Sequence, residues 1–376
     1  MFIIALQSHK MSRKNVARWF AFVCILWVLI FGLRGYGVGN DTIGYSNFFQ
    51  NKNSAYEDYG NVTKGSEMEP GFIFIARIVK FISDSPTIFF TVLAVWLFYF
   101  IYKIYFIVCG SRRSLGSLLV VFIIANSFVT LMVAIRQSTA ICVLLTGIYI
   151  LLKNKDAYRG SWKDVIHSWK LLAGLIIIVS TVIIHKAFIL LVPIMLLAYF
   201  LKLQKRTMYI MIGTSLVLSI FFMREMGQLF NSLFIFFGNA DISFVNTNVM
   251  DIYAKDFGVN TQKIITTIAW VAPLILTIHL SDKKQYKTFF FNCYVFSVCF
   301  FLLFSTSFLI ERINTPFVLL GFTQFMPVIV NKSPRWRAVY LFFIFLMLAN
   351  AFIRYSNWPK TDSCIPYYFF WEHTIK

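Results

Sequence analysis

Long apolar runs occupy most of the chain, and isolated charged residues interrupt two of them. The run 118–152 contains Arg136 near its midpoint. At ~1.5 Å per residue, this run is too long to be a single helix across a ~30 Å hydrocarbon core. The run 171–201 is interrupted in the same way by His185 and Lys186. We therefore predict a break in the helix at each of these two places.

The apolar run lengths predict an all-α polytopic membrane protein with about eleven transmembrane helices. Their expected ranges are 16–33, 86–109, 115–134, 137–152, 171–185, 187–201, 207–223, 264–280, 288–310, 313–330 and 338–353. Two shorter apolar segments, 72–82 and 228–238, are predicted to be interfacial or re-entrant. The first carries Arg77 and Lys80 on an apolar helix, which is typical of a helix at the membrane surface.

The composition agrees with a membrane protein, because 59% of the 376 residues are hydrophobic and 43 are Phe. We expect one integral membrane domain over residues 1–376, since no polar segment is long enough for a second folded unit. Its longest external connections are 34–71 and 224–262. The first apolar span has no small-residue cleavage motif after it and is expected to remain as an anchor.

The net charge of +19 is better explained by membrane topology than by nucleic acid binding. With the N-terminus in the cytoplasm, the cytoplasmic segments hold 20 Lys and Arg against 3 acids, and the external segments hold 14 against 13. This distribution follows the positive-inside rule. Joining 115–152 into one helix would move the basic loop 153–170 outside, so the charge pattern also supports a break at Arg136.

Arg136 and Arg312 lie on different predicted spans at the same depth, near the outer face. Two guanidinium groups at the mouth of a membrane cavity suit a diphosphate, because each donates a forked pair of hydrogen bonds and keeps its charge. The alternative is that both side chains extend to the lipid headgroups, as Arg does at many span ends. The break at Arg136 has no other obvious polar content, which favours a functional role for that residue.

His185 is the only histidine at an outer span end in the predicted topology. Such a histidine can take a proton from an attacking sugar hydroxyl. The alternative is a histidine that is hydrogen-bonded inside the helix bundle. Its neighbour Lys186 and the neighbour of Arg136, Gln137, lie in the same two breaks and are candidates for binding substrate.

Three acidic residues and one tyrosine complete the polar set at the outer face. Asp41 and Tyr45 are four residues apart, so a helix starting at residue 40 would place both on one face, with Asp41 at its start. Asp41 could equally cap that helix. Glu69 opens the 72–82 helix and could cap it or hold a sugar. Glu311 precedes Arg312 directly and can point at Arg136, because adjacent helical residues do not face each other.

Several chemistries have no motif in this chain. There is no DxD, GxxxxGK[ST], GxSxG or HExxH sequence. The six cysteines show no CxxC or Cys/His spacing, so a disulfide framework or a zinc site is not expected. We expect neither a metal nor another cofactor, and no nucleic acid partner.

At these residues the chain resembles the EpsG/Wzy group of bacterial polysaccharide polymerases. The resemblance rests on GNDTIGYSNFF (39–49), EPGF (69–72), AIRQSTA (134–140), IIHKAF (183–188) and ERINTPF (311–317), in this order. It implies a metal-independent glycosyltransferase in the bacterial inner membrane that acts at the periplasmic face. The implied donor is a glycan on undecaprenyl diphosphate, and the implied acceptor is one lipid-linked repeat unit; a chain-length regulator is a further candidate partner.

The resemblance also suggests roles for the residues. Arg136 and Arg312 would hold the diphosphate, and His185 would activate the acceptor hydroxyl, with Asp41 or Glu311 as rival bases. Tyr45 and Glu69 would position sugar. Other classes remain as alternatives: a flippase or other transporter of lipid-linked oligosaccharide, an O-antigen ligase, and a membrane acyltransferase. The polar residues gather at one face rather than at the midplane, which favours a polymerase over a transporter.

Overall fold

The protein is helical in the part of the chain that the structure describes. The computed structural model describes residues 11–51, 68–109, 131–154, 167–222, 261–282, 288–304, 308–321 and 369–371, with a few residues between 225 and 232 and between 335 and 346. Within these residues, extended pairing is limited to one antiparallel bridge between Arg34 and Phe369.

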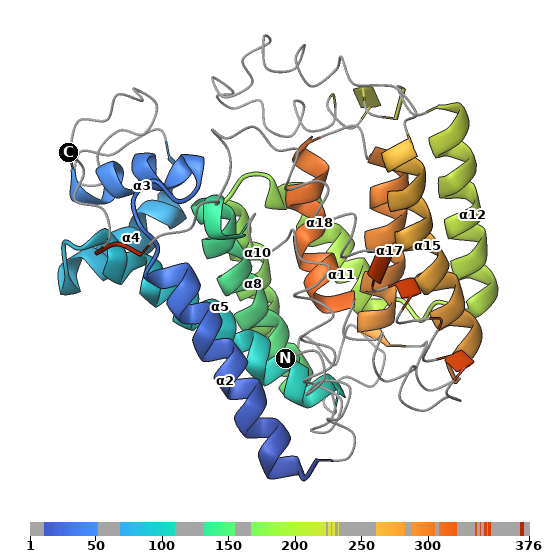
Figure 1. Ribbon diagram of the computed structural model, residues 1–376, viewed down its shortest axis with the longest axis horizontal. Helices are drawn as coiled ribbons and strands as arrows, with labels where there is room; N and C mark the ends of the chain where they lie inside the picture. Colours follow the sequence, from blue (N-terminus) through green and yellow to red (C-terminus); the bar gives the residue numbers. More distant parts are fainter. Residues whose placement is uncertain are drawn as a thin grey trace. The chain divides into compact units, whose positions relative to one another are not determined.

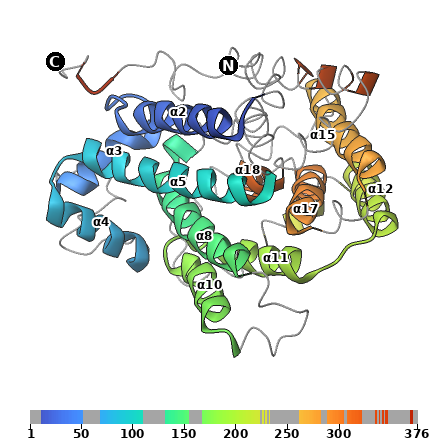
Figure 2. The same ribbon diagram turned by 90° about the horizontal axis from the view of Figure 1, so that it is seen from below.

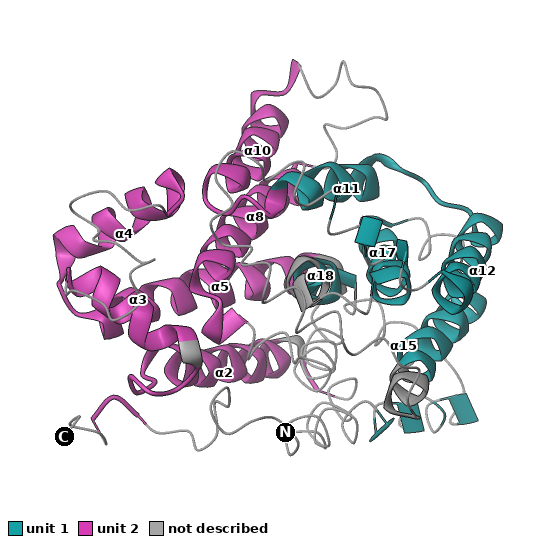
Figure 3. Cartoon of the chain, turned by 90° about the horizontal axis from the view of Figure 1, so that it is seen from above, with its two compact units in different colours: residues 1–10, 116–127, 189–354 teal, residues 11–115, 128–188, 355–376 magenta. Residues whose placement is uncertain are grey.

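The chain divides into two compact units (Figure 3). Unit 2 comprises residues 11–115, 128–188 and 355–376, and unit 1 comprises residues 1–10, 116–127 and 189–354. The single membrane domain expected from the sequence stays a prediction.

Four helices of unit 2 pack in a row, each one against the next (Figures 1 and 2). They are α2 (Arg13–Gly32), α5 (Pro86–Cys109), α8 (Ile135–Lys153) and α10 (Trp169–Ser180). In three of them the segments Lys14–Gly32, Pro86–Ile107 and Ile135–Lys153 are long and apolar enough to cross a membrane. The protein is therefore a helical membrane protein, and α8 is the most buried of these three helices.

Small residues allow α8 and α10 to pack closely. A Cβ atom at Gly147 would lie 2.8 Å from the carbonyl oxygen of Gly174, and one at Gly174 would lie 2.8 Å from Cδ2 of Leu151. Paired glycines let two backbones approach in membranes, where packing rather than the exclusion of water brings helices together.

Unit 1 is arranged around α17 (Phe289–Phe304), which contacts α12 (Lys205–Phe221), α15 (Thr261–Leu280) and α18 (Phe308–Gly321). Helix α11 (Phe188–Phe200) precedes these helices in the chain. The side chain of Asn292 in α17 donates hydrogen bonds to the carbonyls of Ala198 and Leu201, both at 2.8 Å, and so connects α17 to α11.

The boundary predicted at Glu311 and Arg312 is wrong, because α18 begins at Phe308 and runs through both residues. The sequence reasoning took a charged pair as a helix end, although neither residue breaks a helix. Residues 305–307 are Ser, Thr and Ser, which favour the start of a helix more strongly.

Both predicted breaks beside the candidate site residues are confirmed. Residues 131–133 are helical, Ala134 is not (φ −80°, ψ 74°), and α8 begins at Ile135. Similarly, α10 ends at Ser180, a 3₁₀ turn η4 (Thr181–Ile183) follows, and α11 begins only at Phe188. Most of the predicted spans 338–353 and 115–134 and of the segment 228–238 lies outside the described residues, so the count of eleven stays a prediction.

Arg34, which immediately follows the first span, is almost completely buried at 2% exposure. Its Nη1 donates to the Phe31 carbonyl at 2.6 Å, and its Nε donates to Oγ1 of Thr42 at 3.3 Å. The guanidinium also lies over the ring of Phe90, 4.1 Å from its centroid. Arg34 thus joins the end of α2 to α5 and to α3 (Asn40–Gln50).

A C-terminal segment returns to the same end of α2. The Phe370 N–H donates to the Leu33 carbonyl at 3.0 Å, beside the bridge from Phe369 to Arg34. Leu33 directly follows α2, a candidate span that begins at Arg13. If α2 crosses the membrane, residues 13 and 371 lie on opposite faces, and the chain between them crosses an odd number of times.

We therefore expect an epitope tag placed before α2 and a tag placed after residue 376 to lie on opposite sides of the membrane. The measurement is the access of an impermeant protease to each tag in intact cells and after permeabilisation. Tags that are both cut, or both protected, in intact cells would contradict an odd number of crossings, and with it the predicted eleven.

Candidate active site at the broken helices

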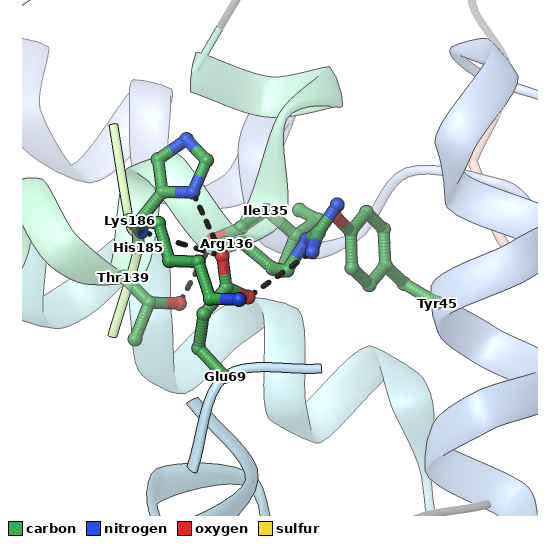
Figure 4. Close-up of polar contacts among 7 residues, drawn as sticks. All are labelled: Tyr45, Glu69, Ile135, Arg136, Thr139, His185 and Lys186. Atoms are coloured by element: carbon green, nitrogen blue, oxygen red, sulfur yellow. Dashed lines mark hydrogen bonds and ion pairs between the residues drawn. The ribbon is translucent and has the colours of Figure 1, made fainter. Parts of the chain in front are cut away.

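Four separate segments of unit 2 bring polar side chains to one place (Figure 4). Tyr45 comes from α3, and Glu69 directly precedes α4 (Pro70–Ile82). Arg136 lies in the first turn of α8, and His185 follows η4. The breaks in the two apolar runs therefore supply Arg136 and His185, and the connecting segment 34–71 supplies their partners.

The carboxylate of Glu69 is the centre of this cluster. Its Oε2 accepts a hydrogen bond from Nη1 of Arg136 at 3.0 Å, and its Oε1 lies 3.3 Å from Nδ1 of His185. Oε1 also accepts a long hydrogen bond, 3.4 Å, from the backbone N–H of Lys186. On the other side, Nε of Arg136 donates to the Tyr45 hydroxyl at 3.0 Å.

The cluster is sheltered but not sealed. Tyr45 is 3% exposed and the Glu69 side chain 7%, whereas those of Arg136 and His185 are 17% and 19% exposed. The Glu69 carboxylate is therefore more deeply buried than Arg136 and His185. These two side chains are the groups that a ligand could reach.

The conformation of Ala134 places Arg136 in the first turn of α8. Its backbone angles are close to those of an inverse γ-turn, which reverses the chain over three residues. The Ala134 carbonyl accepts the backbone N–H of Ser138 at 2.9 Å, and the single hydroxyl hydrogen of Ser138 is shared between the carbonyls of Leu131 and, at 3.1 Å, Ala134, so that the Leu131 carbonyl also has a partner. A break in the membrane is tolerated when such bonds satisfy the backbone.

Glu69 occupies the N-cap position of α4, yet its side chain makes no capping hydrogen bond. The carboxylate turns instead to Arg136 and His185. Two residues later, Gly71 permits this placement, because a Cβ atom there would lie 2.8 Å from the Ile183 carbonyl oxygen and 2.9 Å from Cγ1 of Ile184. The start of α4 thus lies directly against the backbone that leads to His185.

Helix α3 is held so that Tyr45 faces Arg136. Gly39, before its first residue, has φ 85°, a conformation that favours glycine. Aromatic rings pack α3 against α4 and α5, with Phe48 and Phe72 5.7 Å apart and Phe49 and Phe89 4.7 Å apart. The ammonium of Lys80 on α4 donates to the Phe49 carbonyl near the end of α3.

The partners of Glu69 keep it ionised. Burial by itself would raise its pKa, but the hydrogen bond with His185 and the charge of Arg136 outweigh this effect and lower the pKa from 4.5 to about 2. An ionised carboxylate only accepts hydrogen bonds, so Nδ1 of His185 must carry the proton in this contact. In the neutral ring, Nε2 is then the nitrogen that can accept a proton.

A model of one protein family matches residues 17–369, nearly the whole chain. The chain belongs to the EpsG family. No curated protein and no solved structure matches it. This membership agrees with the resemblance seen in the five sequence motifs and supports, in general terms, the role of a glycosyltransferase-like polysaccharide polymerase.

In this EpsG-family chain, the remaining candidate residues are Asp41, Gln137, Lys186, Glu311 and Arg312, and of these Lys186 contacts Glu69 through its backbone N–H. Asp41 lies in the first turn of α3, one turn before Tyr45. Gln137 is 2% exposed, whereas Lys186 has an exposed side chain. Glu311 and Arg312 lie on α18 in unit 1, and their side chains are outside the described part of the structure. Their suggested roles in binding or catalysis stay predictions.

Sequence reasoning missed how the site is held together. Glu69 was expected to cap α4 or to hold a sugar, and Glu311 was considered as a partner for Arg136; in the structure Glu69 pairs with Arg136 and with His185. The roles of Arg34 and Gly71 were also missed, although Gly71 stands in the EPGF motif. Among the described residues there is no group of three or more His, Cys, Asp or Glu that could hold a metal.

Gly71→Ala should disturb the site, because the new methyl group meets a backbone carbonyl that cannot move aside easily. We expect a lower thermal midpoint for the purified protein in detergent and a loss of polysaccharide product in cells. Gly213→Ala in α12 is the control, since nothing lies within 4 Å of a Cβ atom there. Equal behaviour of the two variants would contradict the proposed close approach.

Stability should fall in acid as Glu69 is protonated. A lowered pKa means that Glu69 stabilises the folded state above its ordinary value of 4.5 and that this contribution is lost as the pH approaches about 2. The thermal midpoint in detergent, measured across this range, should fall less for Glu69→Gln than for the parent. Asp84→Asn is the matched control, because the Asp84 side chain is 84% exposed; an identical acid profile for both variants would refute the assignment.

Proposed function

We propose that this chain joins lipid-linked repeat units into a polysaccharide by glycosyl transfer at the outer face of the bacterial inner membrane. The observation that carries the proposal is the convergence of Arg136, Glu69 and His185 in one cluster at the ends of membrane helices. EpsG-family membership supports the general class of reaction. Both substrates would be oligosaccharides on undecaprenyl diphosphate, and a chain-length regulator would be a partner.

In the proposed reaction, a hydroxyl oxygen of the acceptor sugar attacks the anomeric carbon of the donor. The new glycosidic C–O bond forms as the bond to the diphosphate oxygen breaks, and the leaving diphosphate takes the bonding electron pair. His185 accepts the hydroxyl proton at Nε2. Glu69, already bonded to Nδ1, then pairs with the imidazolium that results.

Arg136 would stabilise the charge that develops on the departing diphosphate. A guanidinium has five N–H donors, and the contacts with Tyr45 and Glu69 use Nε and Nη1. These two contacts fix the plane of the guanidinium, so it need not reorganise when charge develops. Arg312 would add a second cation if its side chain reaches the same substrate.

The first experiment is deletion of the gene in its host, with the surface glycan and the lipid-linked intermediates analysed side by side. A surface glycan that stops at one repeat unit supports a polymerase. Repeat units trapped on the cytoplasmic leaflet would indicate a flippase, and polymer that stays on its lipid carrier would indicate a ligase. Either of these results would overturn the proposal.

Complementation of this deletion tests Arg136. Arg136→Ala should reduce polymer by ~100-fold or more, since one charge-stabilising contact contributes on the order of 3 kcal/mol to the transition state. Arg136→Lys keeps the charge opposite Glu69 and should fold, yet it cannot form the fork and should stay poorly active. Arg18→Ala, at an exposed arginine of α2, is the control. Normal polymer from Arg136→Ala at normal protein levels would remove Arg136 from the mechanism.

His185→Gln should keep a polar group but lose the base, so polymer should shorten or disappear while the protein is still inserted at normal levels. The control is His167→Gln, at an exposed histidine just before α10. Polymer of full length from His185→Gln would exclude His185 as the proton acceptor.

A further inference from the structure

Helix α4 is apolar on two faces, and unit 2 covers one of them. Phe72, Ile73, Ala76 and Val79 are buried toward the rest of the unit. The opposite face is exposed, and its apolar side chains recur at helical spacing. This exposed stripe consists of Phe74, Ile78, Phe81 and Ile82, which are 64%, 50%, 95% and 73% exposed.

The exposed stripe continues onto a helix that is a candidate membrane span. Only residues 83–85 separate α4 from α5, and Ile88 in the first turn of α5 is 41% exposed. The α4 helix itself is too short to cross, because 13 residues make ~20 Å of helix against a ~30 Å hydrocarbon core. The stripe therefore ends beside the start of the apolar segment of α5.

Polar groups mark the boundary of the stripe. Arg77 is exposed beside Phe74 and Ile78, whereas Lys80, only 16% exposed, is held by the Phe49 carbonyl and by Asp84 at 3.2 Å. An apolar face with an exposed basic residue at its edge is typical of a helix that lies in the membrane interface, with the charge at the phosphate level. Four large apolar side chains in water would instead form a patch of a kind that soluble surfaces avoid.

We infer that α4 lies in the headgroup–acyl boundary of one leaflet, with its exposed stripe against phospholipid. Glu69 at the start of this helix is then held at the level of the headgroups. Provided that the proposed function is correct, this is also the level at which the diphosphate of a lipid-linked substrate arrives.

Photo-crosslinking tests the lipid contact without requiring activity. Benzoylphenylalanine replaces Phe81 or Phe74 in the full-length protein, which is reconstituted in vesicles of phosphatidylethanolamine and phosphatidylglycerol. We expect adducts mainly with lipid at both positions, and adducts within the chain at Phe72, a control on the buried face (0% exposed). Adducts at Phe81 mainly with a peptide of the same chain, or with a second copy, would overturn the inference.

A second measurement tests whether the membrane contact supports the site. Phe81→Gln should lower polymer several-fold in cells, and Ile220→Gln, at an exposed apolar residue of α12 (65%), should not. Unchanged polymer from Phe81→Gln would show that the stripe does not set the level of Glu69. The deletion strain tests the polymerase proposal separately. The crosslinking test of the lipid contact is independent of it, because lipid adducts at Phe81 do not depend on the reaction.

Discussion

The arrangement of unit 2 depends on one buried carboxylate that must stay ionised. Glu69 is surrounded by protein, and an unpaired charge there would be costly. It stays ionised because Arg136 and His185 lie on its two oxygens, which draws the start of α4, the start of α8 and the segment after η4 together. Removing one partner of a buried pair typically costs 3–5 kcal/mol, whereas the intact pair adds little net stability. Its effect is thus to select one arrangement of these segments.

That arrangement requires an irregular backbone inside a membrane protein. The turn at Ala134 and the interruption after η4 both break the regular helical hydrogen bonding, and the Ser138 hydroxyl provides a partner for the Leu131 carbonyl at the first. Gly71 lets the start of α4 contact the backbone at the end of η4. The buried Arg34 holds α3 in place through a hydrogen bond. The chain therefore departs from regular helix at the places where the side chains of the cluster come together.

Sequence reasoning located the breaks at Arg136 and His185, because a charged residue within an apolar run is a local signal. It also considered a helix starting at residue 40, which would carry Tyr45, and predicted a helix after Glu69 from the apolar run 72–82. It could not predict the pairing of Glu69, because Arg136 and His185 are 67 and 116 residues away in the sequence. From the sequence alone, both of these residues are interpreted as groups that act on substrate. Charge alone misplaced the start of α18, where Glu311 and Arg312 are compatible with a helix.

The shared carboxylate also bears on the order of chemical events. With a pKa near 2, Glu69 holds a proton too weakly to be an effective base at neutral pH, which agrees with the proposed role of His185 as the proton acceptor. In the resting site, Glu69 neutralises much of the charge of Arg136. In the proposed reaction, a His185 that takes the hydroxyl proton would become a second cation on the same carboxylate, so less of the Glu69 charge would screen Arg136. The guanidinium would then attract the departing diphosphate more strongly at the moment when its negative charge develops. One carboxylate between two cations would in this way couple proton removal from the acceptor to stabilisation of the leaving group.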